Sequence, residues 1–372
     1  MVATREAHGA ATAGDIFDGE WRDWKTGIFF ASRMRRLADA GIQVFIVLGN
    51  HDAENRFIAR LELSGNVRVL SSRAAETVDL QDLEVAIHGR SFPRRDVKED
   101  LVASYPAPVK ARFNIGMLHT ACGRSGHENY APCSLDELVN KGYDYWALGH
   151  VHVREVLHEN PHVIFPGNLQ GRHERETGPK GATIVTVEHG KVQAIEACEL
   201  DAIRWCQLNI DVGEAQDVYG VAAIVRDEID AARQDANGRS LALRVRLVGR
   251  TSLHHTLIVR ERTVVEEIET SAATVADDIW IEKVEIETQP AIHAEGVDPT
   301  VSGLIQAAIA ELGDGAFANA AVEAALHELS TKFPNGAHRD DVFARIRLDA
   351  GARADAIAQA TIDSAGEAPR EA

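Results

Sequence analysis

Three short apolar runs, each ending in polar residues that can bind a metal, constrain the fold of this chain most. They are "IQVFIVLGNHD" at 42–52, "FNIGMLHT" at 113–120 and "YDYWALGHVH" at 143–152. Each apolar part has the length and the β-branched or aromatic content of a buried strand. Amphipathic stretches alternate with such runs from about 25 to 200, which predicts a layered α/β domain. Because ligands of open α/β sheets bind beyond the carboxyl ends of the strands, we expect these polar ends to converge.

Other segments of the chain predict the remaining elements. The stretch 25–41 has apolar positions at helical spacing and ends at Gly41, a typical C-terminal cap. After residue 160 the pattern becomes antiparallel, and "EHGK" at 188–191 predicts a tight hairpin turn. A composition shift near residue 205 begins a small α+β unit, with helices expected at 213–238 and 254–270 and strands at 239–250 and 277–288.

We therefore expect three regions. Residues 1–204 form the first domain, 205–297 the small α+β domain, and 298–372 an alanine-rich helical segment. No apolar run approaches the roughly 18 residues that span a bilayer, and the N-terminus has no signal-peptide pattern. The four cysteines form no CxxC motif, which favours reduced thiols. The expected compartment is the cytoplasm, with no membrane partner.

The charge balance limits the possible partners. The formal net charge is −18, which is unfavourable for unspecific attraction to polyanions. A protein of this composition that handles nucleic acid needs a local basic face or a metal. The candidates for such a face are Arg90, Arg94, Arg95 and Lys98 in one loop, and Arg172, Arg175 and Lys180 in another. Charged loops of this kind are more often only solvated surface.

The polar strand ends suit phosphoester chemistry. Asp, Asn and His offer oxygen and imidazole ligands without thiolate, a set that suits manganese, iron or zinc. Two such ions can activate a bridging water and neutralise a phosphodiester. Asp15, in the pair Gly14-Asp15, is the strand-end carboxylate placed to bridge them. Taken alone, a strand-end histidine is usually structural and Asn50 could be a turn residue, so only the joint arrangement favours a metal site.

Four motifs in this order carry a resemblance to a known family: "GDIFDGEW" at 14–21, "GNHD" at 49–52, "LHT" at 118–120 and "GHVH" at 149–152. The chain resembles the calcineurin-like metallophosphoesterases and, within them, the SbcD-like DNA repair exonucleases. The stretches 130–156 and 165–181 look similar to a bacterial subgroup of DNA repair exonucleases. The resemblance implies an α/β fold, a four-layer metallophosphoesterase sandwich of two mixed sheets flanked by helices.

The resemblance also implies roles for single residues. Asp15 matches the bridging ligand, and one metal takes in addition Asn50, His119 and His150. His152 matches a ligand of the second metal. His51 matches the histidine that contacts the scissile phosphate and protonates the leaving oxygen, with Asp52 fixing its tautomer. Arg172 and His173 are the expected substrate-binding residues, although His173, like His88 and His127, fits no ligand slot and has a structural reading beside the substrate-contacting one.

One feature departs from the family pattern. The family begins with a strand ending in Asp-x-His, then a helix, then an apolar strand leading into Gly-Asp, and the residues before Gly14 contain neither motif nor apolar strand. We therefore expect the first strand and two ligands of the second metal to be missing, through truncation or deletion, with Glu6 and His8 as weak substitutes. One firmly held divalent metal, with manganese preferred, and an exposed sheet edge follow from this expectation.

The function implied is metal-dependent phosphodiester hydrolysis, as the DNA exonuclease subunit of a repair complex whose activity is weakened by the missing motif. The expected partners are DNA, an SbcC-like coiled-coil ATPase bound by the C-terminal helices, and a second copy of the chain in a homodimer. Those helices could equally pack on their own domain. Two alternatives stay open: a phosphodiesterase or phosphatase of small molecules, and a catalytically impaired scaffold that docks the ATPase.

Overall fold

The computed structural model describes residues 7–17, 24–53, 55, 61–124, 128–291, 323, 326–327 and 341–347. Contacts within the chain divide it into two compact units, Met1–Ala202 and Ile203–Ala372. Each unit is described by itself.

The first sheet of the N-terminal unit contains β1 (Gly9–Ala13), β2 (Gln43–Val47) and β3 (Val67–Val69). Both pairings, β1 with β2 and β2 with β3, are parallel. The expectation that no strand precedes Gly14 is therefore wrong, since β1 ends directly before it. The sequence of β1, GAATA, has weak strand propensity. Strand β1 lies so close to β7 that a side chain on Gly149 would collide with the carbonyl oxygen of Ala13.

Strand β1 is not the strand with the Asp-x-His motif with which the family begins. Residues 1–6, which include Glu6, lie outside the described residues, so the predicted loss of that strand stays a prediction. In the part of the chain that the structure describes, β1 is an edge strand of its sheet.

A second, six-stranded sheet packs against the first. Its strands, in spatial order, are β4 (Glu76–Leu80), β5 (Val85–Gly89), β6 (Phe113–His119), β7 (Tyr145–Gly149), β9 (His162–Phe165) and β8 (Glu155–Glu159). The inner pairings from β5 to β9 are parallel and the two outer ones antiparallel, so the sheet is mixed. The core between the two sheets consists of Phe45, Val47, Leu70, Ile87 and Met117.

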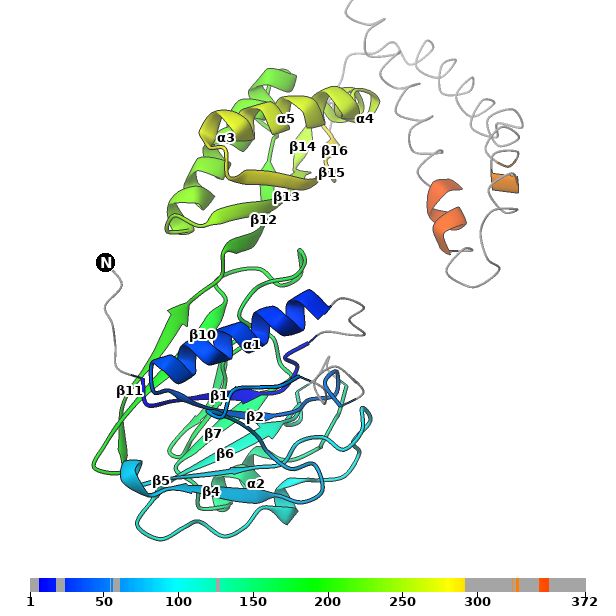
Figure 1. The fold of residues 1–372 in the computed structure, drawn as a ribbon. Helices are drawn as coiled ribbons and strands as arrows, with labels where there is room; N and C mark the ends of the chain where they lie inside the picture. Colours follow the sequence, from blue (N-terminus) through cyan, green and yellow to red (C-terminus); the bar gives the residue numbers. More distant parts are fainter. Residues whose placement is uncertain are drawn as a thin grey trace, which may run out of the picture. The chain divides into compact units, whose positions relative to one another are not determined.

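Helices cover the outer faces of both sheets (Figure 1). Helix α1 (Trp24–Asp39) lies over the first sheet, and Gly41 follows it with a φ of +74°, as predicted for its cap. Helix α2 (Leu135–Asn140) packs on the second sheet, where Trp146 Nε1 donates a hydrogen bond to the carbonyl oxygen of Leu138 at 3.0 Å. The predicted sandwich of two sheets flanked by helices is thereby confirmed, but only the second sheet is mixed, since the described strands of the first are all parallel. Two short 3₁₀ turns, Gln81–Leu83 and Val102–Ser104, lie in its connections.

The N-terminal unit ends in an antiparallel hairpin of β10 (Gly181–Glu188) and β11 (Lys191–Glu199). The turn between them is the predicted one, and its central residues, His189 and Gly190, both have the positive φ that a tight hairpin turn requires. Apolar side chains of the hairpin pack on the six-stranded sheet, against Phe113, Tyr145 and Ile164.

The second unit contains a parallel sheet in the order β12 (Ile203–Asp211), β13 (Ser240–Val248) and β15 (Ile279–Ile286). Helices α3 (Val218–Asp235) and α5 (Glu261–Val275) form one apolar core with this sheet. The helix expected at 254–270 is interrupted at Arg260, which separates α4 (His254–Val259) from α5. The short strands β14 (Arg250–Thr251) and β16 (Gln289–Pro290) pair beside them. The other elements expected in this region are confirmed.

Most of the segment 298–372 lies outside the described residues, and so do most of its predicted helices. The described stretch 341–347 is helical. None of the helices that the structure describes is long and apolar enough to cross a membrane.

Candidate metal centre

Asp15 leaves β1 through a sharp turn that brings its carboxylate against the turn after β2. Gly14 and Asp15 both have positive φ, +95° and +53°. Asp15 Oδ1 accepts a hydrogen bond from the backbone N–H of His51 at 3.1 Å. The approach is so close that a side chain on Gly49 would collide with this oxygen. The glycines of the first two motifs therefore allow the two strand ends to meet.

His119, at the end of β6, presents a lone pair to Asp15 and Asn50. Its Nδ1 lies 2.8 Å from the carbonyl oxygen of Ala13, which can only accept, so Nδ1 carries the proton. Complete burial lowers the pKa of His119 to about 4, and the ring is neutral. Its unprotonated Nε2 then lies 2.9 Å from Asn50 Oδ1 and 3.4 Å from Asp15 Oδ2. Three electron-pair donors face one point.

His150 completes the group from the end of β7. Its φ of +96° turns the residue out of the strand direction. Its Nε2 lies 3.1 Å from the carbonyl oxygen of Glu128, which can only accept, so in the neutral ring Nε2 donates and Nδ1 carries the lone pair. One ligand atom each from Asp15, His119 and His150 lies within 4.8 Å of the other two. The predicted convergence of these strand ends is thus present, with Asn50 joined to it through His119.

This group of four fits a divalent cation. Lone pairs of buried or half-buried oxygen and nitrogen atoms that face one another repel unless a positive charge lies between them. Burial also raises the pKa of Asp15, and a cation beside it would offset that penalty. The mixture of carboxylate, amide and imidazole ligands, with no thiolate, suits manganese, iron or zinc.

Asp52 has a structural role beside the catalytic one predicted for it. It is buried, and its Oδ2 accepts the backbone N–H groups of Ile16 at 3.2 Å and Gly49 at 3.1 Å, while Oδ1 accepts that of Phe17 at 3.1 Å. Burial raises its pKa, against the effect of these hydrogen bonds. Asp52 therefore clamps the turn after β1 to the turn after β2. Control of the tautomer of His51 by Asp52 stays a prediction.

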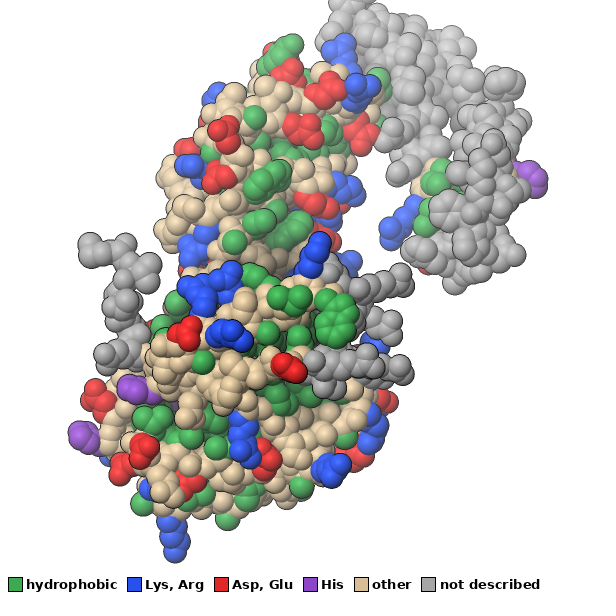
Figure 2. Space-filling model, viewed as in Figure 1, with side chains coloured by type: hydrophobic (Ala, Val, Ile, Leu, Met, Phe, Trp, Pro, Cys, Tyr) green, Lys and Arg blue, Asp and Glu red, His purple; other side chains and the backbone are tan. Residues whose placement is uncertain are grey.

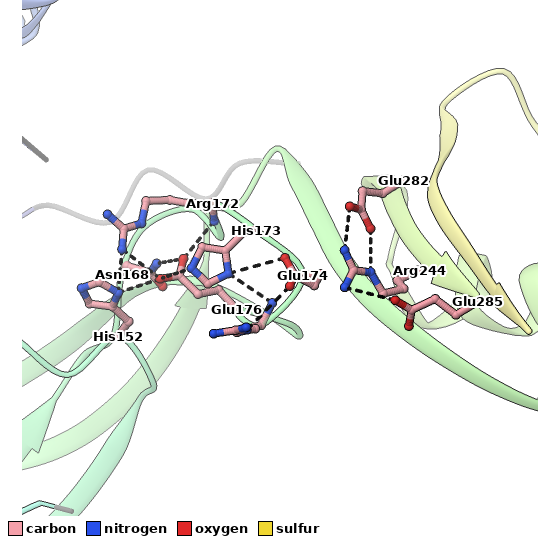
Figure 3. Close-up of polar contacts among 10 residues, drawn as sticks. His152, Asn168, Arg172, His173, Glu174, Glu176, Arg244, Glu282 and Glu285 are labelled. Atoms are coloured by element: carbon pink, nitrogen blue, oxygen red, sulfur yellow. Dashed lines mark hydrogen bonds and ion pairs between the residues drawn. The ribbon is translucent and has the colours of Figure 1, made fainter. Parts of the chain in front are cut away.

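His152 lies outside the group of three and belongs to a second polar cluster, whose carboxylate, Glu176, sequence reasoning missed. Its Nδ1 lies 2.7 Å from Oε1 of Glu176, whose side chain is 8% exposed (Figure 3). Burial alone would raise the pKa of Glu176, but hydrogen bonds from His152 and Arg172 outweigh it and hold the pKa at about 2. The charged stretch "GRHERETG" reads as solvated surface, and only its flanking glycines and Glu176, four residues after Arg172, hinted at a folded turn.

The two predicted substrate-binding residues lie in the same cluster. The guanidinium of Arg172 contacts Glu176 at 3.2 Å and lies 3.2 Å from Nδ1 of His152. His173 Nδ1 accepts the backbone N–H of Arg175 at 3.2 Å, and its Nε2 is 3.8 Å from Glu176. Contact of either residue with substrate stays a prediction.

The remaining histidines divide between two outcomes. His88 is buried, lies within hydrogen-bond distance of Thr77 and Asn114, and stacks on Tyr143, so its structural interpretation is confirmed. His127 lies outside the described residues.

Comparison with known proteins agrees with this geometry. Residues 11–154 match the family model described as calcineurin-like phosphoesterase, and residues 205–289 match that of the middle domain of the metallophosphoesterase YhaO. The chain is 34% identical over 302 residues to the "Uncharacterized metallophosphoesterase YhaO" of Bacillus subtilis (strain 168), which covers 79% of this chain and 73% of that protein.

More distant similarity links the chain to two archaeal proteins named "DNA double-strand break repair protein Mre11". The one from Methanopyrus kandleri is 26% identical over 221 residues, 51% of this chain and 47% of that protein. The one from Sulfurisphaera tokodaii is 25% identical over 225 residues, 54% of each chain. Both matches span about half of the relative. The match to YhaO over most of both chains, together with the matching family model, shows that the chain belongs to the calcineurin-like metallophosphoesterases.

Proposed function

We propose that this metallophosphoesterase hydrolyses phosphodiester bonds of DNA. The observation that carries the proposal is the convergence of Asp15, Asn50, His119 and His150 at the ends of four strands. The similarity to two proteins named for DNA double-strand break repair supports DNA as the substrate. Membership of the SbcD-like subgroup is part of the same proposal.

The chemistry divides between the ion and the side chains. A bound divalent cation would lower the pKa of a water and neutralise charge on the phosphate. Asp15 and His119 are held in fixed orientations by the backbone groups of His51 and Ala13, so the ligands need little rearrangement. His51 lies beside Asp15 and is half-buried, which leaves its ring a path to the substrate. We assign it the transfer of a proton to the leaving oxygen.

A second candidate, hydrolysis of small phosphodiesters, is favoured by the charges. Of the basic loop residues, Arg94 pairs with Glu99 at 2.6 Å and Lys98 with Asp96 at 2.8 Å. On the face drawn in Figure 2, basic and acidic side chains are interspersed rather than gathered by sign. With the net charge of −18, this arrangement gives a long polyanion little attraction beyond the cation itself.

A paired assay separates the two candidates. The full chain with Mn²⁺ is offered linear duplex DNA, single-stranded DNA and a small phosphodiester such as bis(p-nitrophenyl) phosphate. The proposal predicts shortening of DNA that the variant Asp15→Asn does not catalyse. Hydrolysis of the small ester with no DNA cleavage would establish the second candidate instead, and no turnover of any substrate by a metal-loaded chain would support the impaired scaffold.

Association with a coiled-coil ATPase and homodimer formation are further parts of the proposal. The region expected to bind the ATPase, 298–372, lies mostly outside the described residues. Light scattering on the purified chain tests the dimer. Co-purification with an SbcC-like ATPase, compared between the full chain and a chain ending at residue 297, tests the docking region.

A further inference from the structure

Glu176 holds the ring of His152 in one chemical form. The 2.7 Å contact joins His152 Nδ1 to Glu176 Oε1. An ionised carboxylate can only accept, so Nδ1 of a neutral His152 must carry the proton and Nε2 the lone pair. Arg172 also approaches Nδ1, at 3.2 Å, but a nitrogen that donates to a carboxylate cannot accept from a guanidinium at the same time. The shorter contact decides in favour of Glu176.

The carboxylate of Glu176 is itself fixed from several directions. Its Oε2 accepts the backbone N–H of Arg172 at 2.9 Å and Nδ2 of Asn168 at 2.8 Å. The guanidinium of Arg172 donates to Oε1 at 3.2 Å. Glu176 is 8% exposed at its side chain, whereas the surface carboxylate Glu99, paired with Arg94, is 59% exposed. A carboxylate held this way keeps its orientation, and an exposed one does not.

The backbone of His152 is held by the same loop. Its carbonyl oxygen accepts the backbone N–H of Asn168 at 3.2 Å and the Nζ of the buried Lys180 at 3.3 Å. Main chain and ring of His152 are therefore both fixed by residues 168–180, which come from outside the strand-end motifs.

We propose that Glu176 is a positioning residue, which fixes His152 with Nδ1 protonated and Nε2 available as the ligand of a second divalent cation. The inference rests on the proposed metal chemistry, because a histidine ligand needs its other nitrogen protonated and its ring oriented. Carboxylate partners of metal-binding histidines typically change metal affinity by about 10- to 100-fold. The carboxylate of Asp15 and the ring of His152 are near enough for their charges to interact.

The first test needs no substitution at Glu176. In metal-free protein labelled with ¹⁵N-histidine, at a pH above the ordinary histidine pKa, two-bond correlations report which ring nitrogen carries the proton. His152→Gln identifies the signals by their disappearance. The inference predicts one tautomer for His152, with Nδ1 protonated. A His152 with protonated Nε2, or an even mixture of both forms, would overturn it.

The second test asks whether Glu176 acts through His152. Mn²⁺ titration calorimetry compares the wild type with Glu176→Gln, His152→Gln and the double variant, and Glu99→Gln serves as the matched control. The inference predicts that Glu176→Gln weakens the weaker Mn²⁺ site about 10- to 100-fold, and that the double variant is no weaker than His152→Gln alone. Equal loss in the presence and absence of His152 would show a merely structural role, and so would unchanged affinity in Glu176→Gln.

These readouts separate the inference from the proposed function. A chain that shows the predicted tautomer and coupling but cleaves neither DNA nor a small ester would leave Glu176 a positioning residue and refute the hydrolysis. Cleavage of DNA with equal Mn²⁺ affinities in wild type and Glu176→Gln would support the hydrolysis and refute the positioning role of Glu176.

Discussion

Two carboxylates with similar acidity, Glu176 in the first unit and Glu285 in the second, are stabilised by different means. Figure 3 shows Glu176 with His152 and Arg172, and Glu285 with Arg244. Both have a pKa of about 2. At Glu285 the main cause is hydrogen bonding from Lys283 and Arg246 on the sheet surface. At Glu176 burial acts in the opposite direction and is outweighed by hydrogen bonds from His152 and Arg172.

The difference shows what separates a site from a scaffold. Glu285 bonds Arg246, the residue directly opposite it on β13, so the pair joins neighbouring strands of the parallel sheet. Glu176 reaches across 24 residues to a histidine that follows a strand end. Both units have parallel strands, yet among the described residues only the strand ends of the first unit bring together side chains able to hold an ion. Parallel topology permits such a site, and the residues at the strand ends decide whether it exists.

The largest effect is expected for Asp15→Asn. Asparagine tolerates the positive φ of this position, so the turn should keep its shape. The variant removes the charge that the cation requires, and we expect loss of the tightly bound ion and a fall in turnover on the order of 1000-fold or more. Calorimetry with Mn²⁺ and the nuclease assay measure both. Retention of metal with full activity would mean that Asp15 is not a ligand.

The next effect concerns the approach of β1 to β7. Gly149→Ala places a methyl group against the carbonyl oxygen of Ala13, and this backbone contact cannot yield by rotation of a side chain. We expect a loss of about 3 kcal/mol or more in the free energy of unfolding of the first unit. Gly65→Ala is the matched control, because Gly65, like Gly149, has no positive φ but has open space around it. Equal denaturation midpoints for the two variants would contradict the close approach.

Low pH should weaken the polar contacts of both Glu176 and Glu285, and high salt should distinguish the two sets of contacts. The pKa values of Glu176 and Glu285 lie near 2 in the folded chain, below the ordinary value of 4.5. Their stabilisation is therefore complete above pH 4.5 and is lost as the pH falls towards 2. In about 1 M salt, where the Debye length is about 3 Å, the contribution of Glu285 to the free energy of unfolding should fall more than that of Glu176.

Denaturant titrations of the wild type, Glu176→Gln and Glu285→Gln across this pH range measure the contribution of each carboxylate to the free energy of unfolding. As the pH falls, the free energy of unfolding should decrease less steeply in each variant than in the wild type. If neither substitution changed this pH dependence, neither carboxyl would have the depressed pKa.

The smallest effect is expected for Glu285→Gln at neutral pH. Its partners Arg246 and Lys283 are 31% and 56% exposed, and surface ion pairs of this kind contribute about 0–1 kcal/mol. The variant should leave Mn²⁺ affinity unchanged. If Glu285→Gln changed Mn²⁺ affinity as much as Glu176→Gln does, the two carboxylates would not differ in their relation to the metal.

The sequence predicted the parts of this fold that rest on strong local patterns. The β-branched runs of β2 and β7, and the helical spacing of α1, suffice to place those elements and the strand-end ligands. Strand β1 escaped prediction because its GAATA sequence has no apolar pattern, and its strand state depends on pairing with β2 and on space beside β7. Glu176 escaped it because nothing local links a loop carboxylate to a histidine 24 residues earlier.

The central claim is that four strand ends share one divalent cation, and anomalous diffraction at the manganese edge tests it most directly. Crystals of the full chain grown with Mn²⁺ should show an anomalous peak in coordination contact with Asp15, Asn50, His119 and His150. A peak elsewhere, with these four side chains only hydrogen-bonded to one another, would contradict the account.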